Sequence, residues 1–432
     1  MAKVTEGKHL PLKKKVKEAV LVPMTKLAWK KIKSGIDEQK PYSKEIDSLV
    51  IISPHAADPM ASKGDEAMLV GVVKKLKALN PKLEITVAVA EEYKNDKISP
   101  LGVKIKPFWS YPFDLKSVFK ECLKYDACFC IGADVMDGHY TSIKSLRTWM
   151  LADLIARTGR PTTIGGFSWN QSPTKPVVDF VKDSLTPKLN VFLRDDVSHS
   201  RFVSISNHPA KVVADNAFLL QPSAEKGIEE VLNWVTKQRN DGRDIVAFNV
   251  HPMLVPDRNP QAISELVNAC VNSAKKLIED QGASILLIPH DYRDGVGDLE
   301  MLAQVEAGIS NKEYVFNFTD MASAAQLKEL AKSVDLVITA RMHLSIGALG
   351  TGTPILCITY QGKFQGLMNH FSLSHDVLIT PDEARDVAKF EEFCLAGFAQ
   401  KAELRAQVEK ELPTVKEKSL LNLRAMLPAV DM

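Results

Sequence analysis

Short apolar runs alternate with longer amphipathic segments along most of the chain. The runs are rich in valine, isoleucine and leucine and end at polar or glycine-containing turns, which is typical of buried β-strands. The segments between them are typical of helices. In "KGDEAMLVGVVKKLKAL" (63–79), for example, Asp65 and Glu66 lie in the first turn, and Asn80-Pro81 follows the last. This alternation predicts parallel sheets with helices on both faces.

The apolar runs form two series, one in each half of the chain. The first contains residues 46–58, 83–92, 126–134, 162–168 and 190–196, and the segment 210–220 closes it. The second contains residues 245–252, 283–291, 314–320, 334–343, 354–360 and 375–384. A polar stretch, "TKQRNDGRD" (236–244), separates the two series and is the expected linker.

A chain of 432 residues is too long for one core. We therefore expect an α/β protein in which two doubly wound Rossmann-like domains face each other across a cleft. The expected segments are a basic N-terminal extension (1–45), an N-terminal domain (46–238), a C-terminal domain (243–386) and C-terminal helices (387–432), which could pack back across the domain junction.

Composition narrows the class of protein. Charged residues are 25% of the chain and the formal net charge is +2, so we expect no nucleic-acid partner. The six cysteines are scattered without a CxxC pair, which indicates buried thiols in a reducing compartment. No secretory signal and no membrane-spanning apolar stretch stand out, so the expected location is cytoplasmic.

The first forty residues differ from the rest because they hold eleven lysines and only four acidic residues. Residues 8–33 mix those lysines with apolar side chains such as Leu27 and Trp29. A basic amphipathic segment of this kind could contact the inner face of a membrane peripherally. Equally, it could be a helical extension packed on the body, although Pro23 is expected to interrupt a single helix. Both interpretations stay open at this point.

An arginine and a histidine lie two residues apart in "VDLVITARMHLSIGALGTGTPILCITY" (334–360). The pattern predicts strand, helix, strand, with Arg341 and His343 at the carboxyl end of the first strand. Ligands gather at that edge of open α/β sheets, where helix N-termini attract anions. Arginine matches carboxylate or phosphate groups, and histidine titrates near neutral pH. The alternative is a surface arginine beside a histidine that caps the helix.

Arg194 ends a strand in the other half, "NVFLRDD". Asp195 and Asp196 could simply pair with it. If they do not, Arg194 and Arg341 at corresponding edges of facing sheets would clamp a small dianion between the domains.

Further polar residues follow the first and third strands of the N-terminal half. His55, Asp58 and Asp65 lie in or just after the loop "SPHAADPMASKGDEAM", and Asp134, Asp137 and His139 lie in "CIGADVMDGHYTS". They could accept sugar hydroxyls or take a proton, or they could be ordinary polar turns. Neither a P-loop nor a GxGxxG turn after a strand is present, and the histidine spacing makes a zinc site improbable, so we expect no metal and no bound cofactor.

Several of these motifs together resemble the polysaccharide pyruvyl transferase family. "ITARMHLSIGALGTGTPILCITYQGK" is similar to its C-terminal signature R-[LM]-H, G-x-P and Y-x-x-K, with Tyr360 and Lys363 at the end. "KGDEAM" is similar to its G-[DN]-E-A helix, and "RDDVS" and "DNAFL" to its R-[DE]-x-x-S and D-x-A-F-L segments. The resemblance extends over residues 47 to about 370.

The resemblance implies a two-domain fold like that of GT-B glycosyltransferases. It implies phosphoenolpyruvate as donor substrate and a pyruvate ketal on a sugar of a cell-surface polysaccharide or its precursor as product. The acceptor would be a sugar or a lipid-linked oligosaccharide. Carried over by residue, the donor site on the C-terminal side would comprise Arg194, Arg341, Met342 through its backbone, His343 and Lys363.

We expect His343 to deliver a proton to the donor, Asp137 or His139 to act as general base, and His55, Asp58, Asp65 and Asp134 to line the acceptor side. The loop before Asp65 is longer than in the family, and a usual G-G-x turn is here "IGADVMDG", so acceptor identity is open. The basic extension is outside the family pattern. Alternatives are a GT-B glycosyltransferase that uses a nucleotide sugar, and a non-catalytic anion- or glycan-binding protein. Oligomeric state is not readable from the sequence.

Overall fold

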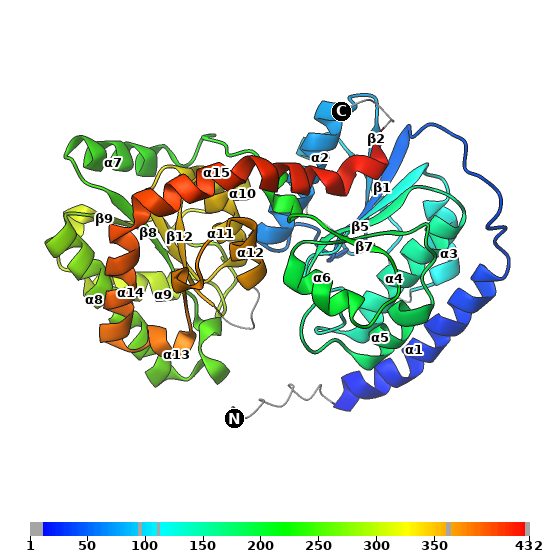
Figure 1. The fold of residues 1–432 in the computed structure, drawn as a ribbon, viewed down its shortest axis with the longest axis horizontal. Helices are drawn as coiled ribbons and strands as arrows, with labels where there is room; N and C mark the ends of the chain where they lie inside the picture. Colours follow the sequence, from blue (N-terminus) through cyan, green and yellow to red (C-terminus); the bar gives the residue numbers. More distant parts are fainter. Residues whose placement is uncertain (1–11, 94–96, 110–112, 360–363, 428–432) are drawn as a thin grey trace.

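The computed structural model describes residues 12–93, 97–109, 113–359 and 364–427 and contains two parallel sheets, one in each half of the molecule (Figure 1). The first sheet has the order β3-β2-β1-β4-β5-β6-β7 and the second the order β10-β9-β8-β11-β12-β13. Helices cover both sheets. The expected fold class is confirmed.

The strands of the first sheet are β1 (Ser48–Ile52), β2 (Glu84–Val89), β3 (Lys104–Pro107), β4 (Ala127–Ile131), β5 (Thr162–Phe167), β6 (Asn190–Leu193) and β7 (Ala210–Val212). Those of the second are β8 (Ile245–Asn249), β9 (Ser284–Leu287), β10 (Val315–Asn317), β11 (Leu336–Thr339), β12 (Ile355–Ile358) and β13 (Leu378–Ile379). Only β3 has no counterpart among the expected runs. It is a largely exposed edge strand with two lysines, so it lacks an apolar run.

The α-helices of the first half are α1 (Leu12–Lys33), α2 (Lys63–Leu79), α3 (Leu115–Cys122), α4 (Ser142–Arg157), α5 (Lys175–Asp183) and α6 (Asp196–Val203). Those that follow are α7 (Glu229–Asn240), α8 (Pro260–Gln281), α9 (Leu299–Gly308), α10 (Ala324–Lys332), α11 (Met342–Leu349), α12 (Gln365–His370), α13 (Pro381–Ala384), α14 (Val387–Ala399) and α15 (Lys401–Leu420). Single 3₁₀ turns include η2 (Asn216–Leu219) and η7 (Leu421–Met426).

The strand order reverses at one place in each sheet. Neighbours β1 and β4 lead to opposite sides of the first sheet, and β8 and β11 do so in the second. A crevice forms outside the carboxyl ends of the strands at such a switch point, because the two following loops diverge. We therefore expect ligand-binding loops after β1, β4, β8 and β11.

The chain passes between the sheets within residues 221–228. The following helix α7 packs on the second half, where Trp234 contacts Phe316 with ring centroids 5.6 Å apart. The expected linker, residues 236–244, overlaps α7, which continues to Asn240.

Helix α15 returns from the second half to the first (Figure 1). Near its start, Arg405 donates to the carbonyl of Val334 at 3.1 Å. At its end, the hydroxyl of Ser419 donates to the carbonyl of Asp215 at 2.7 Å, and Asn422 in η7 donates to the carbonyl of Ala214 at 2.9 Å. The helix is thus bonded to both halves.

The basic extension forms α1, which packs against α4 and α5. The indole of Trp29 donates to Asp153 at 2.8 Å and meets the ring of Phe180 edge-on at 5.1 Å. Pro23 does not interrupt the helix, contrary to expectation. Its ring is on the exposed side, and the hydroxyl of Thr25 donates to the carbonyl of Leu21 one turn earlier. Among the described residues, no helix combines the length and apolarity needed to cross a bilayer.

Candidate active site between the two sheets

The carboxyl end of β11 is joined to its neighbour strand by a polar network. The hydroxyl of Thr339 accepts the N–H of Arg341 at 3.0 Å and donates to Asn249 at 2.9 Å. Arg341 is the N-cap of α11, and Met342 and His343 occupy its first turn, where N–H groups have no partner within the helix. This end of α11 therefore presents donors and a positive dipole to the crevice.

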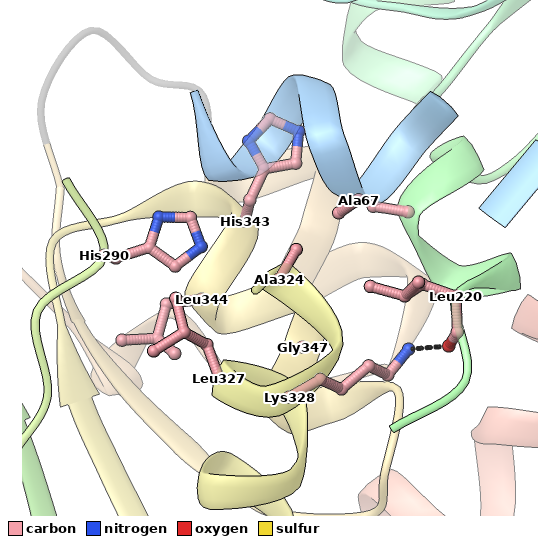
Figure 2. A pocket seen from close by; sticks show the side chains of 10 residues that line it. Ala67, Leu220, His290, Ala324, Leu327, Lys328, His343, Leu344 and Gly347 are labelled. Carbon is pink, nitrogen blue, oxygen red and sulfur yellow. Dashed lines mark hydrogen bonds between the residues drawn. The ribbon is translucent and has the colours of Figure 1, made fainter. Parts of the chain in front are cut away.

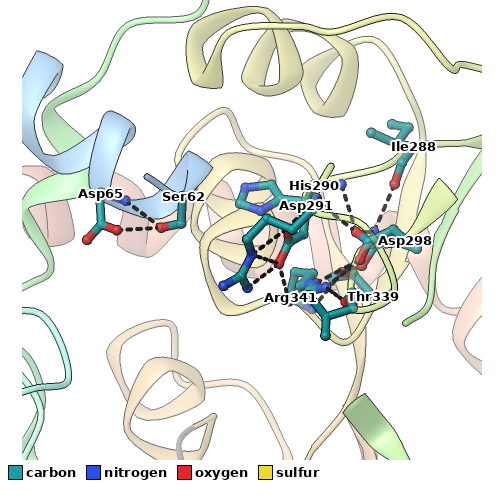
Figure 3. Close-up of polar contacts among 11 residues, drawn as sticks. Ser62, Asp65, Ile288, His290, Asp291, Asp298, Thr339 and Arg341 are labelled. Atoms are coloured by element: carbon teal, nitrogen blue, oxygen red, sulfur yellow. Dashed lines mark hydrogen bonds and ion pairs between the residues drawn. The ribbon is translucent and has the colours of Figure 1, made fainter. Parts of the chain in front are cut away.

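Two carboxylates fix the guanidinium of Arg341 (Figure 3). Its Nε is 3.1 Å from Oδ1 of Asp298, and its Nη1 is 3.3 Å from Oδ2 of Asp291. The other oxygen of Asp298 accepts the backbone N–H of His290 at 2.8 Å. Burial raises the pKa of Asp298, and the charge of Arg341 opposes that shift. Arg341 is thus positioned before any ligand binds, and 13% of its side chain stays exposed.

Arg194, at the carboxyl end of β6, is buried and paired with Asp215. Its Nη1 is 2.9 Å from Oδ2 of Asp215. Neither adjacent aspartate is the partner that the sequence suggested: Asp195 caps α6 through the N–H of Ser198, and Asp196 accepts from Asn369. Within the described part of the chain, Nε of Arg194 is buried without a hydrogen-bond partner.

Asp215 also links Arg194 to the opposite half of the molecule. Its Oδ2 is 3.9 Å from Nε2 of His343. Burial lowers the pKa of His343, while the charge of Asp215 raises it and that of Arg194 lowers it. Burial lowers the pKa of His290, and the positive charges of His343 and Arg341 lower it further. Arg194 and His343 therefore lie on either side of Asp215, and Arg341 precedes His343 by two residues at the start of α11.

The start of α2 closes against the imidazole of His343 (Figure 2). A Cβ on Gly64 would lie 2.2 Å from Nδ1 of His343, so only glycine allows this approach. Glu66 accepts the N–H of Ala324, at the start of α10, at 2.8 Å and forms an ion pair with Lys63. The G-D-E segment is thus one of the contacts between the halves.

Asp65 lies between these groups on the first turn of α2. Its carboxylate accepts from the hydroxyl of Ser62 at 2.8 Å. Burial raises the pKa of Asp65, the positive charges of His55 and His343 oppose this shift, and Asp134 adds to it. Figure 3 shows Asp65 on α2 and Ser62 at its N-cap, apart from the cluster around Arg341. A buried carboxyl with a raised pKa near a histidine suits general acid–base chemistry.

The loop after β4 divides into two parts. Asp134 accepts from the hydroxyl of Tyr140 at 3.0 Å, and its charge acts on Asp65, Arg194 and His343. His139 is exposed, with its ring edge-on to Tyr140 at 5.3 Å. Asp137, in the same loop, is buried.

The side chain of Asp137 is completely buried and shapes the loop. It accepts the N–H of His139 at 2.8 Å and the N–H of Asn170 at 3.0 Å, and the Asn170 side chain also donates to it. Because the carboxylate is buried and both of its oxygens accept hydrogen bonds, we do not retain Asp137 as the general base.

Two cavities lie near these residues. The one beside His343 and Lys328 has a volume of about 10 Å³, enough for about one water. The other, which we call the α1–α4 cavity, has a volume of about 630 Å³, within the range of ligand pockets. It is lined by Glu18, Leu21, Ser53, Pro54, His55, Ala56, Ala57, Asp58, Ala61, Ala90, Glu92, Trp109, Phe113, Thr141, Ile143, Lys144, Arg147 and Thr148.

Two of the four predicted acceptor residues line the larger cavity. His55 and Asp58 line the α1–α4 cavity, and the same loop continues to Asp65 beside His343. Lys363 lies outside the described residues. The sequence analysis did not single out Asp215, Asp291 or Asp298 as site residues. Asp215 had a signal as the first residue of the D-x-A-F-L segment, and Asp291 had one because it ends the expected strand region 283–291.

Two facing Rossmann-like halves define a fold of the GT-B structural class. Solved structures agree. A glycosyltransferase from Rickettsia africae ESF-5 has a TM-score of 0.55 at 10% identity, covering 89% of this chain and 100% of that one. The S. aureus MnaA–UDP complex has a TM-score of 0.55 at 10% identity, with 90% and 99% covered. The UDP-GlcNAc 2-epimerase from Neisseria meningitidis bound to UDP-GlcNAc has a TM-score of 0.51 at 10% identity, with 88% and 99% covered.

The sequence model of the polysaccharide pyruvyl transferase family matches residues 63–362, more than half of the chain. The chain belongs to this family, and its class of activity is that of a transferase. The expected resemblance is confirmed. Sequence comparison with curated proteins gives no match.

Proposed function

We propose that the protein transfers the pyruvate group of phosphoenolpyruvate to sugar hydroxyls of a cell-surface polysaccharide or its precursor and forms a ketal. The observation that carries the proposal is the link through Asp215, which joins Arg194 of one half to His343 of the other beside Arg341. A small substrate with a carboxylate and a phosphate on one carbon matches two arginines and a helix N-terminus without a metal or bound cofactor.

The donor would bind between the halves, with its anionic groups on Arg194, Arg341 and the first N–H groups of α11, including that of Met342. The space beside His343 now accommodates about one water, so side chains there have to move when the donor binds. Lys363 is retained as a proposed donor contact.

In the first step, His343 donates a proton to the methylene carbon of the donor, and cationic character develops at C2. Burial lowers the pKa of His343, and the charge of Asp215 opposes that shift, so this carboxylate supports the protonated form needed here. A sugar hydroxyl attacks C2 and gives its proton to a carboxylate. We assign this role to Asp65, which replaces Asp137, and we keep His139 as the alternative base.

In the second step, the C2–O bond to phosphate breaks and phosphate leaves with the bonding electron pair. The arginines stabilise the developing charge, a contribution that typically reaches 10²–10³-fold for one donor group. A neighbouring hydroxyl then attacks C2, loses its proton and closes the ketal. The products are the pyruvylated sugar and inorganic phosphate.

We assign the acceptor to the α1–α4 cavity. Trp109 and Phe113 provide apolar surface, while His55, Asp58 and Glu92 provide hydrogen-bonding groups. Sugars bind to such combinations because their rings have both apolar faces and polar edges. Asp134 would orient the attacking hydroxyls near Asp65.

The test is phosphate release from phosphoenolpyruvate in the presence of a glycan extract, combined with calorimetric binding of phosphoenolpyruvate and UDP-sugars. The proposal expects release that depends on glycan and falls at least about hundredfold in Arg341→Ala. Binding of a UDP-sugar instead of phosphoenolpyruvate would indicate a glycosyltransferase. Tight donor binding without release would indicate a non-catalytic anion- or glycan-binding protein.

A further inference from the structure

Helix α1 has two apolar faces, and only one of them is covered. Trp29 is buried against α4 and α5. On the opposite face, Val20, Met24 and Leu27 are 55%, 60% and 69% exposed. Their spacing of four and three residues places them in one stripe along the helix, which exposed Pro23 widens. Three large apolar side chains in one exposed row need a partner more than scattered ones do.

Lysines surround this stripe. Lys30, Lys31 and Lys33 form the last turn of α1. Residues 18–33 of α1 hold four lysines and one acidic residue. A second copy of this chain in parallel orientation would place like charges next to each other. An anionic surface is complementary, since a helix that lies in a lipid interface has an apolar stripe flanked by lysines.

The position of α1 connects this face to the α1–α4 cavity. Glu18 and Leu21 line that cavity, and Glu18 accepts from the hydroxyl of Thr141, next to the start of α4, at 2.7 Å. The helix therefore carries the exposed stripe on one side and forms a cavity wall on another. Residues 12–33 precede the segment that matches the family, which starts at residue 63.

We propose that the stripe of Val20, Met24 and Leu27, with its flanking lysines, docks α1 flat onto an anionic lipid bilayer. Both readings of the basic extension then hold, because one face packs on the body and the other contacts lipid. The same geometry identifies the acceptor as a lipid-anchored glycan, an inference that rests on the proposed function. Docking of α1 places the α1–α4 cavity, to which we assign the acceptor, beside the bilayer.

Vesicle co-sedimentation of the full chain tests the proposal. Phosphatidylcholine vesicles with phosphatidylglycerol should bind the protein, phosphatidylcholine alone should not, and added salt should weaken binding. The variant V20S/M24S/L27S should bind about tenfold or more weakly. The matched control V203S/M253S/M321S replaces side chains that are 43%, 47% and 72% exposed elsewhere and should bind like the parent chain.

The charge-reversal variant K30E/K31E should lose binding to the phosphatidylglycerol vesicles. Absence of binding by the parent chain, or equal loss in the control, overturns the proposal. So does a dimer in sedimentation equilibrium that V20S/M24S/L27S dissociates, because the face would then join two copies. All these readouts are independent of pyruvate transfer, so failure of docking and failure of the proposed function are distinguishable.

Discussion

The carboxylate of Asp215 lies 3.9 Å from Nε2 of His343, although the two residues belong to opposite halves of the molecule. The same oxygen is 2.9 Å from Nη1 of Arg194. One carboxylate therefore pairs with a permanent cation and, through its charge, opposes the lowering of the pKa of His343 by burial.

Asp215→Asn should lower the free energy of unfolding and shift the high-pH limit of activity to lower pH. The buried guanidinium of Arg194 loses its partner, which typically costs about 3–5 kcal/mol of unfolding free energy. Without the charge of Asp215, the pKa of His343 should fall. His343 then deprotonates earlier as pH rises, so the decline of activity toward high pH should begin at a lower pH than in the parent chain. Denaturant unfolding and a pH profile of kcat/KM measure these effects. Asp196→Asn, at an exposed site, is the control; an unchanged profile in Asp215→Asn would refute the link.

Gly64→Ala should abolish most of the activity, because the new Cβ would meet Nδ1 of His343 at 2.2 Å. Gly347→Ala is the matched change in a helix with room, where the nearest atoms are 3.9 Å away, and should stabilise by about 0.5–1 kcal/mol. Transfer assays and thermal unfolding of both variants distinguish the two effects. Full activity in Gly64→Ala would show that the ring is free to move.

Asp65→Asn should reduce kcat by about 10²–10⁴-fold, the usual contribution of a general base, while donor affinity changes little. In the parent chain, burial raises the pKa of Asp65, so activity should rise with pH as this carboxyl ionises. That limb of the kcat profile should be missing in the variant. If Asp65→Asn keeps this rise of kcat with pH, another group, such as His139, acts as the general base.

The contact between Lys328 and Leu220 should make the free energy of unfolding depend on pH. Its Nζ donates to the carbonyl of Leu220 at 2.7 Å, and burial lowers its pKa from 10.5 to about 7. Between those values the unfolded chain binds more protons than the folded one. Stability should therefore rise with pH above 7, by up to about 1.4 kcal/mol per pH unit. Lys328→Met should remove this rise in denaturant unfolding, whereas the half-exposed control Lys332→Met should retain it.

The sequence predicts the layers well because burial of parallel strands leaves a local signature. Every expected strand region contains a strand, and the edge strand β3 was missed for lack of apolar residues. Arg341 and His343 were found because a strand end is readable from its own neighbours.

Partners far apart in sequence are not readable in that way. Arg194 has two adjacent aspartates, yet its partner is 21 residues away. Asp137 has the composition of an exposed turn, and only the fold shows that it is buried with its oxygens occupied by backbone groups. Which carboxylate is structural and which faces the crevice depends on how the halves meet.

Helix α15 constrains how the donor can enter. Its first half is bonded to Val334, and its end is bonded to the carbonyl of Asp215. A rod attached at both ends fixes the separation of its two anchor points but leaves their relative angle free. We therefore expect any opening of the crevice to be a rotation about those anchors, one of which is Asp215.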